Sequence, residues 1–185
     1  MARLQDLARE DMTAAQLRLA DRITAAFGTV GGPYKVLIHE AELTERLQDV
    51  LDYLRNDLAV PARLRMLATM VVVRYWRAAY AWSVNRPNAI KEGLSEAVLD
   101  AIERGEVPHL DRAEDRAVYD ASVELLETRA LSDATYRRAV EILGEKYLRE
   151  IVVILGFFAV IALCVNAFEV ELRPGAMPPA FARPK

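Results

Sequence analysis

The sequence has only one cysteine, Cys164, and two histidines among its 185 residues. A single cysteine excludes a disulfide within the chain and any Cys-x-x-Cys redox or zinc motif. No His-x-x-x-His, Glu-x-x-His or His/Asp cluster offers three or four ligands, so we expect no metal site and no other cofactor. The cysteine usage favours a reducing, cytoplasmic location.

The chain also has little net charge and few lysines. Lys+Arg total 24 against 27 Asp+Glu, a net charge of −3, and only four of the cations are lysine. Because there is no basic surplus to neutralise phosphates, we expect no nucleic-acid partner. Arginine forms fixed, bidentate pairs with carboxylates, so the arginine surplus instead indicates specific ion pairs or carboxylate recognition.

Long apolar runs are almost absent. The one candidate extends from Ile151 to Val165, is bounded by Glu150 and Asn166, and is shorter than the roughly 20 residues that a membrane span needs. We therefore expect no membrane partner and predict a buried central helix over 145–166. The N-terminus becomes charged again by Arg9, before any apolar export segment develops.

The apolar fraction of 53% is ample for a core, and its spacing is helical almost throughout. Ser, Thr and Asp residues precede the expected helices and Gly residues follow several of them. The sequence therefore predicts an all-α fold. The expected helices cover 13–26, 40–57, 61–87, 96–104, 111–128, 132–144 and 145–166, with Thr13, Ser95, Asp111 and Ser132 as N-caps and Gly28, Gly105 and Gly144 as stops.

Three segments are expected along the chain. Residues 1–32 form an N-terminal helical arm with a Gly-rich link, 33–172 form the helical domain, and 173–185 form a Pro-rich tail. The link lacks the Gly-Lys-Ser/Thr ending of a phosphate loop and is interpreted as a connector. The tail is either disordered or an arm that lies on a neighbouring subunit.

One face of the expected 61–87 helix carries residues that suit a ligand pocket. Positions 74, 77, 78, 81 and 85 share this face if the helix is continuous. Its guanidinium groups are suited to a carboxylate and its aromatic side chains to a ring. The other interpretation is that the arginines pair with acids on neighbouring helices and the aromatic residues belong to the core. The residues concerned are Arg74, Arg77, Ala78, Ala81 and Asn85, with Tyr80 and Trp82 beside them.

The remaining reactive side chains allow two interpretations each. His39 lies next to Glu40 at the start of a helix, where it serves either as a general base or in packing and capping. Cys164 lies between Leu163 and Val165, and apolar burial raises the pKa of a thiol and suppresses the reactive thiolate. We expect Cys164 to be inert.

From residue 33 to residue 168, about three quarters of the chain, the sequence resembles the carboxymuconolactone decarboxylase family of the AhpD-like superfamily. The pieces that carry the resemblance are colinear. They are Pro33–His39, Leu54–Arg63, Val71–Trp76, Tyr80–Trp82, Pro87–Leu94, Val118–Asp120, Glu124–Leu126, Leu131–Tyr136, Leu155–Phe158 and Val165–Phe168.

The resemblance implies an antiparallel helical domain that assembles as a homo-oligomer, a trimer or a hexamer, with sites near the subunit contacts. It also implies one of two activities. Members of the family either decarboxylate lactones from aromatic breakdown or reduce peroxides through a Cys-x-x-Cys pair.

This chain departs from the motifs of both branches. The redox cysteine pair is absent, and Ala81-Trp82-Ser83-Val84-Asn85 stands where the decarboxylase-like branch usually has Glu-Trp-x-x-His. Met66 replaces a second family glutamate, and Gly156-Phe157-Phe158 replaces Gly-Tyr-Tyr. Each change removes a group that can exchange a proton, which general acid–base catalysis requires. Asn85 can still orient a ligand by hydrogen bonding.

The resemblance predicts a lyase or decarboxylase that acts on, or binds, a small carboxylated lactone or aromatic-breakdown product. Two alternatives remain open: an AhpD-like peroxidase, and a non-catalytic oligomer that binds a small acid or simply assembles. The partner is then a small-molecule carboxylate. The expected catalytic residues are Arg74, which would stabilise enolate charge, Asn85 and His39. The expected ligand-binding residues are Met66, Arg77, Tyr80, Ala81, Trp82, Phe157 and Phe158.

Overall fold

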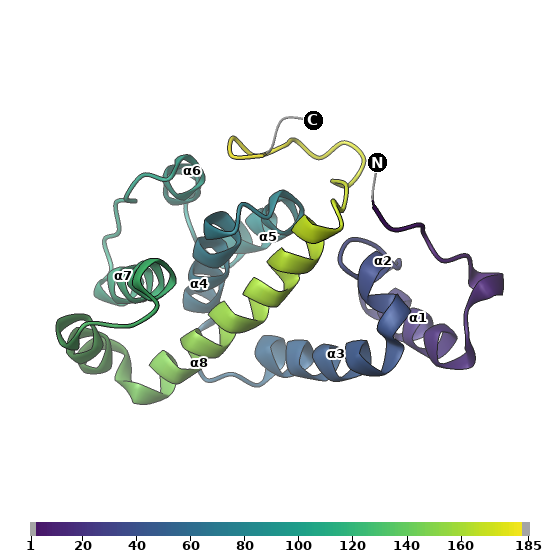
Figure 1. Cartoon of the computed structure of the whole chain (residues 1–185). Helices are drawn as coiled ribbons and strands as arrows, with labels where there is room; N and C mark the ends of the chain where they lie inside the picture. The colour runs from purple at the N-terminus through teal and green to yellow at the C-terminus, as the bar shows by residue number, and fades with distance from the viewer. Residues whose placement is uncertain (1–2, 183–185) are drawn as a thin grey trace.

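The computed structural model describes residues 3–182, and this part of the chain contains helices and no strand. The long helices α4, α5, α7 and α8 pack around a common core, and α1 to α3 lie along one side of it (Figure 1). The helices are α1 (Ala14–Phe27), α2 (Tyr34–Leu37), α3 (Ala41–Asn56), α4 (Ala62–Tyr75), α5 (Ala79–Lys91), α6 (Glu96–Arg104), α7 (Ala113–Thr128) and α8 (Asp133–Ala167), with 3₁₀ turns at Arg9–Asp11 and Ile38–Glu40.

Most helix ends lie where the capping residues predicted them. Thr13 accepts from the backbone N–H of Gln16, whose side chain accepts in return from Thr13, and α1 stops at Gly28 in the left-handed region. The side chains of Ser95 and Ser132 cap α6 and α8 by accepting from the backbone N–H groups of Val98 and Thr135. The predicted Asp111 cap is wrong, because α7 begins one residue later with Arg112 as an N-cap that makes no side-chain bond.

The predicted continuous helix over 61–87 is also wrong. Helix α4 ends at Tyr75, α5 begins at Ala79, and Arg77 between them has a φ of 52°. The amide of Asn166 on α8 donates to the Trp76 carbonyl oxygen at 2.6 Å, which satisfies one backbone group that the break frees. Pro87, expected to end the helix, lies inside α5.

Helix α8 changes direction at Gly144, as predicted for a stop at this position. The backbone of Gly144 has φ 76° and ψ 158°, which interrupts the helical geometry within 133–167. Glycine alone adopts this region readily, since it has no Cβ. The C-terminal part of α8 then crosses the bundle as its central helix (Figure 1).

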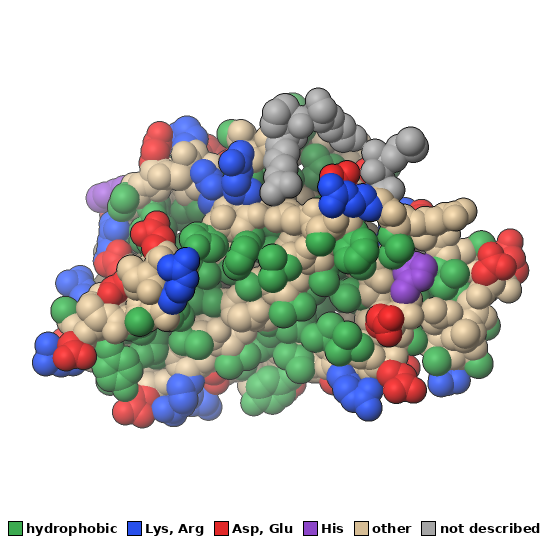
Figure 2. Space-filling model, viewed as in Figure 1, with side chains coloured by type: hydrophobic (Ala, Val, Ile, Leu, Met, Phe, Trp, Pro, Cys, Tyr) green, Lys and Arg blue, Asp and Glu red, His purple; other side chains and the backbone are tan. Residues whose placement is uncertain are grey.

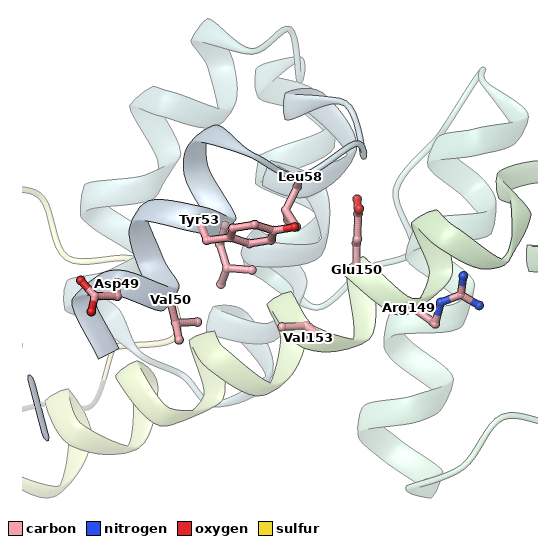
Figure 3. Close-up of a pocket in the computed structure, with 8 residues that line it drawn as sticks. Asp49, Val50, Tyr53, Leu58, Arg149, Glu150 and Val153 are labelled. Atoms are coloured by element: carbon pink, nitrogen blue, oxygen red, sulfur yellow. The ribbon is translucent and has the colours of Figure 1, made fainter. Parts of the chain in front are cut away.

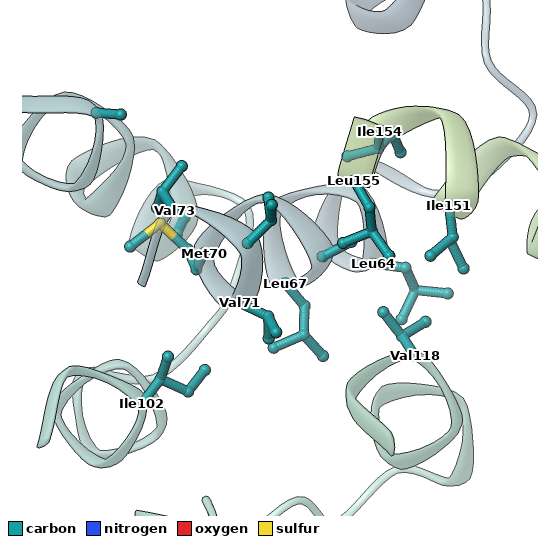
Figure 4. Packing of buried hydrophobic residues seen from close by; sticks show 14 of the residues in the cluster. Leu64, Leu67, Met70, Val71, Val73, Ile102, Val118, Ile151, Ile154 and Leu155 are labelled. Atoms are coloured by element: carbon teal, nitrogen blue, oxygen red, sulfur yellow. The ribbon is translucent and has the colours of Figure 1, made fainter. Parts of the chain in front are cut away.

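The main core lies where α8, α4 and α7 meet (Figure 4). Leu67, Met70 and Ile154 are fully buried there, and burial of such side chains contributes about 1.5–3 kcal/mol each. A smaller apolar cluster, centred on Leu19 and Ile23, joins α1 to Ile38 and the start of α3. The N-terminal arm is therefore packed on α3 through a core of its own.

The outer face of α8 is apolar but uncovered in the described chain. Val153 is 51% exposed and Leu163 is 48% exposed, and Val152 and Val160 are exposed beside them. By length and composition alone, α8 is one helix that could cross a membrane, a criterion that the core helix of a bundle also meets. Its inner face, with Ile151, Ile154 and Leu155, lies in the core as predicted.

Residues 173–182, here called the C-terminal strap, run back over α5 from the end of α8 (Figure 1). Pro179 and Phe181 are buried, so the described part of the tail packs against its own chain. The reason is a notch formed by Arg74, Arg77 and Trp82, which receives the Phe181 ring and carbonyl oxygen. Positions 183–185 of the predicted tail lie outside the described residues.

Candidate functional site

A cavity of about 90 Å³ lies where the Gly-rich link, α3, α5 and α8 meet. This volume is well below the roughly 300–1,000 Å³ of drug-sized ligand pockets, so the cavity suits only a very small ligand or a few waters. It is lined by Phe27, Thr29, Gly31, Pro33, Tyr34, Leu51, Arg55, Tyr80, Ala81, Val84, Asn85, Phe157, Phe158, Ile161 and Arg173.

Five of the fifteen residues that line the cavity are aromatic. Phe27 and Tyr34 stack with ring centroids 5.4 Å apart on the side of the link, and Phe157 and Phe158 meet edge to face at 5.6 Å on α8. Tyr80 adds a fifth ring from α5. Such walls favour a flat, apolar ligand body, since ring faces and edges pack against π-systems and hydrocarbon.

Two arginines supply the charge of the cavity. The Arg55 guanidinium lies 4.7 Å from the Phe27 ring centroid, and Arg173 Nε donates to the Tyr80 hydroxyl at 3.4 Å. Both side chains are exposed, which places them at the solvent side of the cavity. No acidic residue is among the described residues that line it, so the local field favours an anion.

Tyr34 connects the cavity wall to a polar network on α3. Its hydroxyl donates to Gln48 Oε1, the Gln48 amide donates to Asp52 at 2.7 Å, and Arg22 pairs with Asp52 at 2.8 Å. Burial raises the pKa of Tyr34 to about 12, against the smaller opposing effect of Arg55. Tyr34 is therefore a neutral hydroxyl at physiological pH.

The Gly-rich link contributes to the site through a close approach. Gly32 has φ 58°, and a Cβ at this position would overlap the ring and hydroxyl of Tyr80. Only glycine fits both the backbone conformation and the contact. The link was predicted to be a connector, and the structure also makes it a wall of the cavity.

Five of the residues expected to form the site line this cavity: Tyr80, Ala81, Asn85, Phe157 and Phe158. One N–H of the Asn85 amide donates to the Ala81 carbonyl oxygen at 2.8 Å. The amide has a second N–H and its Oδ1 to offer a ligand.

Arg74, Arg77 and Trp82 lie at the strap instead. Arg74 donates to the Glu103 carbonyl oxygen at 2.7 Å, and Arg77 donates to that of Phe181. Burial, and then repulsion from Arg77, lowers the pKa of Arg74 from its usual value. The shared helix face predicted for Arg74, Arg77, Ala81 and Asn85 does not exist, because the break at Arg77 turns α4 and α5 apart.

His39 and Met66 are also away from the cavity. His39 is an exposed side chain in the 3₁₀ turn that precedes α3. Met66 is half-buried on α4 and packs against the main core. Neither is among the residues that line the cavity.

The structure adds Phe27, Tyr34, Arg55 and Arg173 to the site. Tyr34 and Arg55 belong to sequence pieces that carried the family resemblance, so that signal could have found them. Nothing in the local sequence indicates that Phe27 or Arg173 lines the cavity. Both reach it only because the N-terminal arm and the C-terminal strap fold back over the helical domain.

Metal or thiol chemistry finds little support at the site. No group of three or more His, Cys, Asp or Glu residues that could hold a metal exists in residues 3–182. Cys164 is half-buried on α8, does not line the cavity, and has a pKa raised by burial. The raised pKa reduces its thiolate fraction at neutral pH.

A second hollow, an open groove of about 420 Å³, lies between α3 and α8 (Figure 3). Val50, Tyr53, Leu58 and Val153 form most of its floor, with Asp49 towards one end and Arg149 towards the other. Glu150, also on the groove, accepts from the backbone N–H groups of Ala59 and Val60 at 3.2 and 2.7 Å and so holds the α3–α4 connection.

Comparisons with known proteins show the fold. No family model matches the sequence, and no curated protein matches it. The structure is similar to a peroxidase-related protein from Ralstonia eutropha described as an alkylhydroperoxidase AhpD core, with TM-score 0.77 and 12% identity over 94% of this chain and 93% of that one.

Two further solved structures agree. A peroxidase-related protein from Silicibacter has TM-score 0.73 and 14% identity over 97% of this chain and 92% of that one. A protein of unknown function from Agrobacterium tumefaciens, described as a putative antioxidant defence protein AhpD, has TM-score 0.65 and 12% identity over 71% of this chain and 91% of that one. The chain therefore has the AhpD-like all-α fold that the sequence resemblance implied.

Proposed function

We propose that the aromatic cavity binds a small, largely apolar carboxylate, such as a carboxylated lactone or a product of aromatic ring breakdown. The observation that carries this proposal is the combination of Arg55 and Arg173 with ring-lined walls and no acidic lining residue. A guanidinium pairs with a carboxylate in fixed geometry, and the rings accommodate the apolar body.

The same lining favours binding over proton transfer. Its titratable groups are two arginines and two tyrosines, and the pKa of Tyr34 is raised to about 12. General acid–base catalysis works best with a group that titrates near the operating pH. A decarboxylation at this site would instead rely on Arg55 and Arg173 to stabilise the enolate left when CO₂ departs, with water returning the proton.

Calorimetric titration with benzoate and with benzamide tests charge recognition. Benzoate should bind, and the neutral benzamide should bind at least about tenfold more weakly, since a hydrogen bond to a charged group contributes about 1.5–3 kcal/mol. Arg55→Gln should remove most of this difference. Arg138→Gln, which changes an exposed arginine on α8 that does not line the cavity, is the matched control. Equal affinity for the two probes in the native protein would refute the proposal.

Release of CO₂ from a carboxylated muconolactone distinguishes a lyase from a binding protein. Turnover that Arg55→Gln abolishes and Arg74→Ala leaves unchanged would place decarboxylation at the cavity. The reverse pattern would support the assignment of Arg74 made from the sequence. Saturable uptake without product would identify a binding module.

Peroxidase activity is the second candidate, favoured by the fold neighbours described as peroxidase-related. Its only candidate thiol here is Cys164, whose pKa is raised by burial. Peroxide-dependent oxidation of a thiol reductant that Cys164→Ser abolishes would support this candidate. Activity that survives in Cys164→Ser would exclude thiol-based peroxidase chemistry.

We also propose that the chain forms a homo-oligomer, a trimer or a hexamer, through the apolar face that α3 and α8 share. Apolar side chains gather over this face (Figure 2), including exposed Tyr53, Val153 and Leu163. Patches of this kind mark association surfaces.

Light scattering during gel filtration measures the assembly directly. Val153→Asp should dissociate the oligomer, because it buries an unpaired charge in the contact. Val107→Asp, at an exposed apolar position outside this face, is the control. A native protein that elutes as a monomer, or that floats with lipid vesicles through the same face, would contradict the proposal.

A further inference from the structure

The C-terminal strap is anchored at Phe181. This side chain is 5% exposed, and its ring meets the edge of Trp82 with centroids 5.4 Å apart. The Arg74 guanidinium lies 4.8 Å from the same ring centroid. Phe181 is thus held by an aromatic contact and a cation–π contact at once.

Backbone groups reinforce the anchor. Arg77 donates to the Phe181 carbonyl oxygen from Nε at 3.2 Å and from Nη2 at 3.0 Å. The N–H of Ala180 donates to Glu103 Oε1 at 2.7 Å. By contrast, Met177 in the middle of the strap is 83% exposed. The attachment is therefore concentrated near the end of the strap, in residues 179–181.

The other end of the strap reaches the cavity. Arg173 lines the cavity and donates to the Tyr80 hydroxyl, while Phe181 rests on Trp82, two residues further along α5. Both ends of the strap therefore lie on the first turn of the same helix. Between Arg173 and Phe181, Pro179 is buried beside the anchor and Ala176 is partly buried, while the other residues are exposed.

We propose that Phe181 is a positioning residue: its seating on Trp82 fixes the strap, and the strap holds Arg173 in the cavity wall, where Arg173 selects a carboxylate. The part of this inference that concerns the ligand rests on the proposed function. The mechanical part, that Phe181 determines where Arg173 lies, stands on the contacts above. Release of Phe181 would free Arg173 from Tyr80 and leave the remaining lining in place.

The first experiment needs no ligand and compares Phe181→Ala with Met177→Ala in the full chain by NMR. Phe181→Ala should shift the Arg173 Nε–H resonance and expose the Ala180 amide to solvent exchange. Met177→Ala should leave both unchanged, and Phe181→Tyr should restore both. An Arg173 resonance that is unaffected in a folded Phe181→Ala protein would overturn the inference.

The second experiment measures benzoate and benzamide affinities in the same variants. Phe181→Ala should weaken benzoate binding about tenfold, as expected from losing one charge-assisted hydrogen bond, and leave benzamide binding unchanged. In an Arg173→Gln background, Phe181→Ala should have no further effect. Equal losses for both probes would indicate general disruption and contradict a role through Arg173. Native protein that binds neither probe refutes the proposed function, while the NMR comparison still decides the inference.

Discussion

Arg77 and Phe181 are 104 residues apart in the sequence, yet two nitrogens of the Arg77 guanidinium donate to the Phe181 carbonyl oxygen. The same Arg77 has φ 52° in the break between α4 and α5. One residue therefore both interrupts the helix and fastens the strap. The break points Arg77 towards the chain's own tail. An unbroken helix would instead have placed Arg77 on the same face as Ala81 and Asn85.

Gly32→Ala should destabilise the protein by about 1–3 kcal/mol, since a positive φ at a non-glycine residue is strained and the new Cβ would overlap Tyr80. Gly31→Ala is the matched control, because its Cβ would meet only Thr29 Cγ2 at 3.6 Å. Urea denaturation measures both.

Gly144→Ala should cost about 1–3 kcal/mol, because φ 76° with ψ 158° is accessible mainly to glycine. Gly156→Ala, within regular helix, should instead stabilise by about 0.5–1 kcal/mol. Neither added Cβ meets an atom within 4 Å, so the pair isolates the backbone effect. Opposite shifts of the thermal midpoint are expected. Stabilisation by both substitutions would mean that α8 tolerates straightening at residue 144.

Asp115→Ala should destabilise by about 3–5 kcal/mol, the usual cost of breaking a buried ion pair. Asp115 is 1% exposed and accepts from Arg63 Nε at 3.2 Å and Nη2 at 2.5 Å. Glu145→Ala removes the exposed pair with Arg149 and should change stability by less than about 0.5 kcal/mol. Chemical denaturation of the two variants gives the comparison, and equal effects would contradict a structural role for the Arg63–Asp115 pair.

Stability should fall at alkaline pH through Tyr34. Its folded pKa is raised to about 12 from 10, so its contribution is complete below pH 10 and is lost as the pH rises through 12. Tyr34→Phe should remove this component of the pH dependence, whereas Tyr53→Phe, at an exposed position, should leave it unchanged. Denaturation midpoints measured between pH 10 and 12 test the sign. A native-like slope in Tyr34→Phe would assign the effect to another group.

Local signals predicted most of the helices because capping is a local interaction. Thr13, Ser95 and Ser132 each bond a backbone N–H three residues ahead, so the sequence contains both partners. The break at Arg77 could not be predicted in this way. Its partners, Asn166 and Phe181, lie about 90 and 104 residues away, and arginine carries no intrinsic preference for a positive φ.

The residues that line the cavity also divide into those that the sequence predicted and those that only the tertiary structure reveals. Tyr80, Ala81, Asn85, Phe157 and Phe158 were predicted from motif positions and do line it. Arg74 and Arg77 were expected beside them only because a continuous helix was assumed. Arg55 and Arg173 take up the positive side of the cavity instead, through the packing of α3 and the return of the strap.

The sequence by itself determined the all-α architecture, most helix ends and the absence of a paired cysteine, since these depend on periodicity, local caps and composition. Only the tertiary structure decided which arginines line the cavity and where the tail lies. The physical reason is that a single residue with positive φ redirects a whole helix, and the contacts that hold it there come from the far end of the chain.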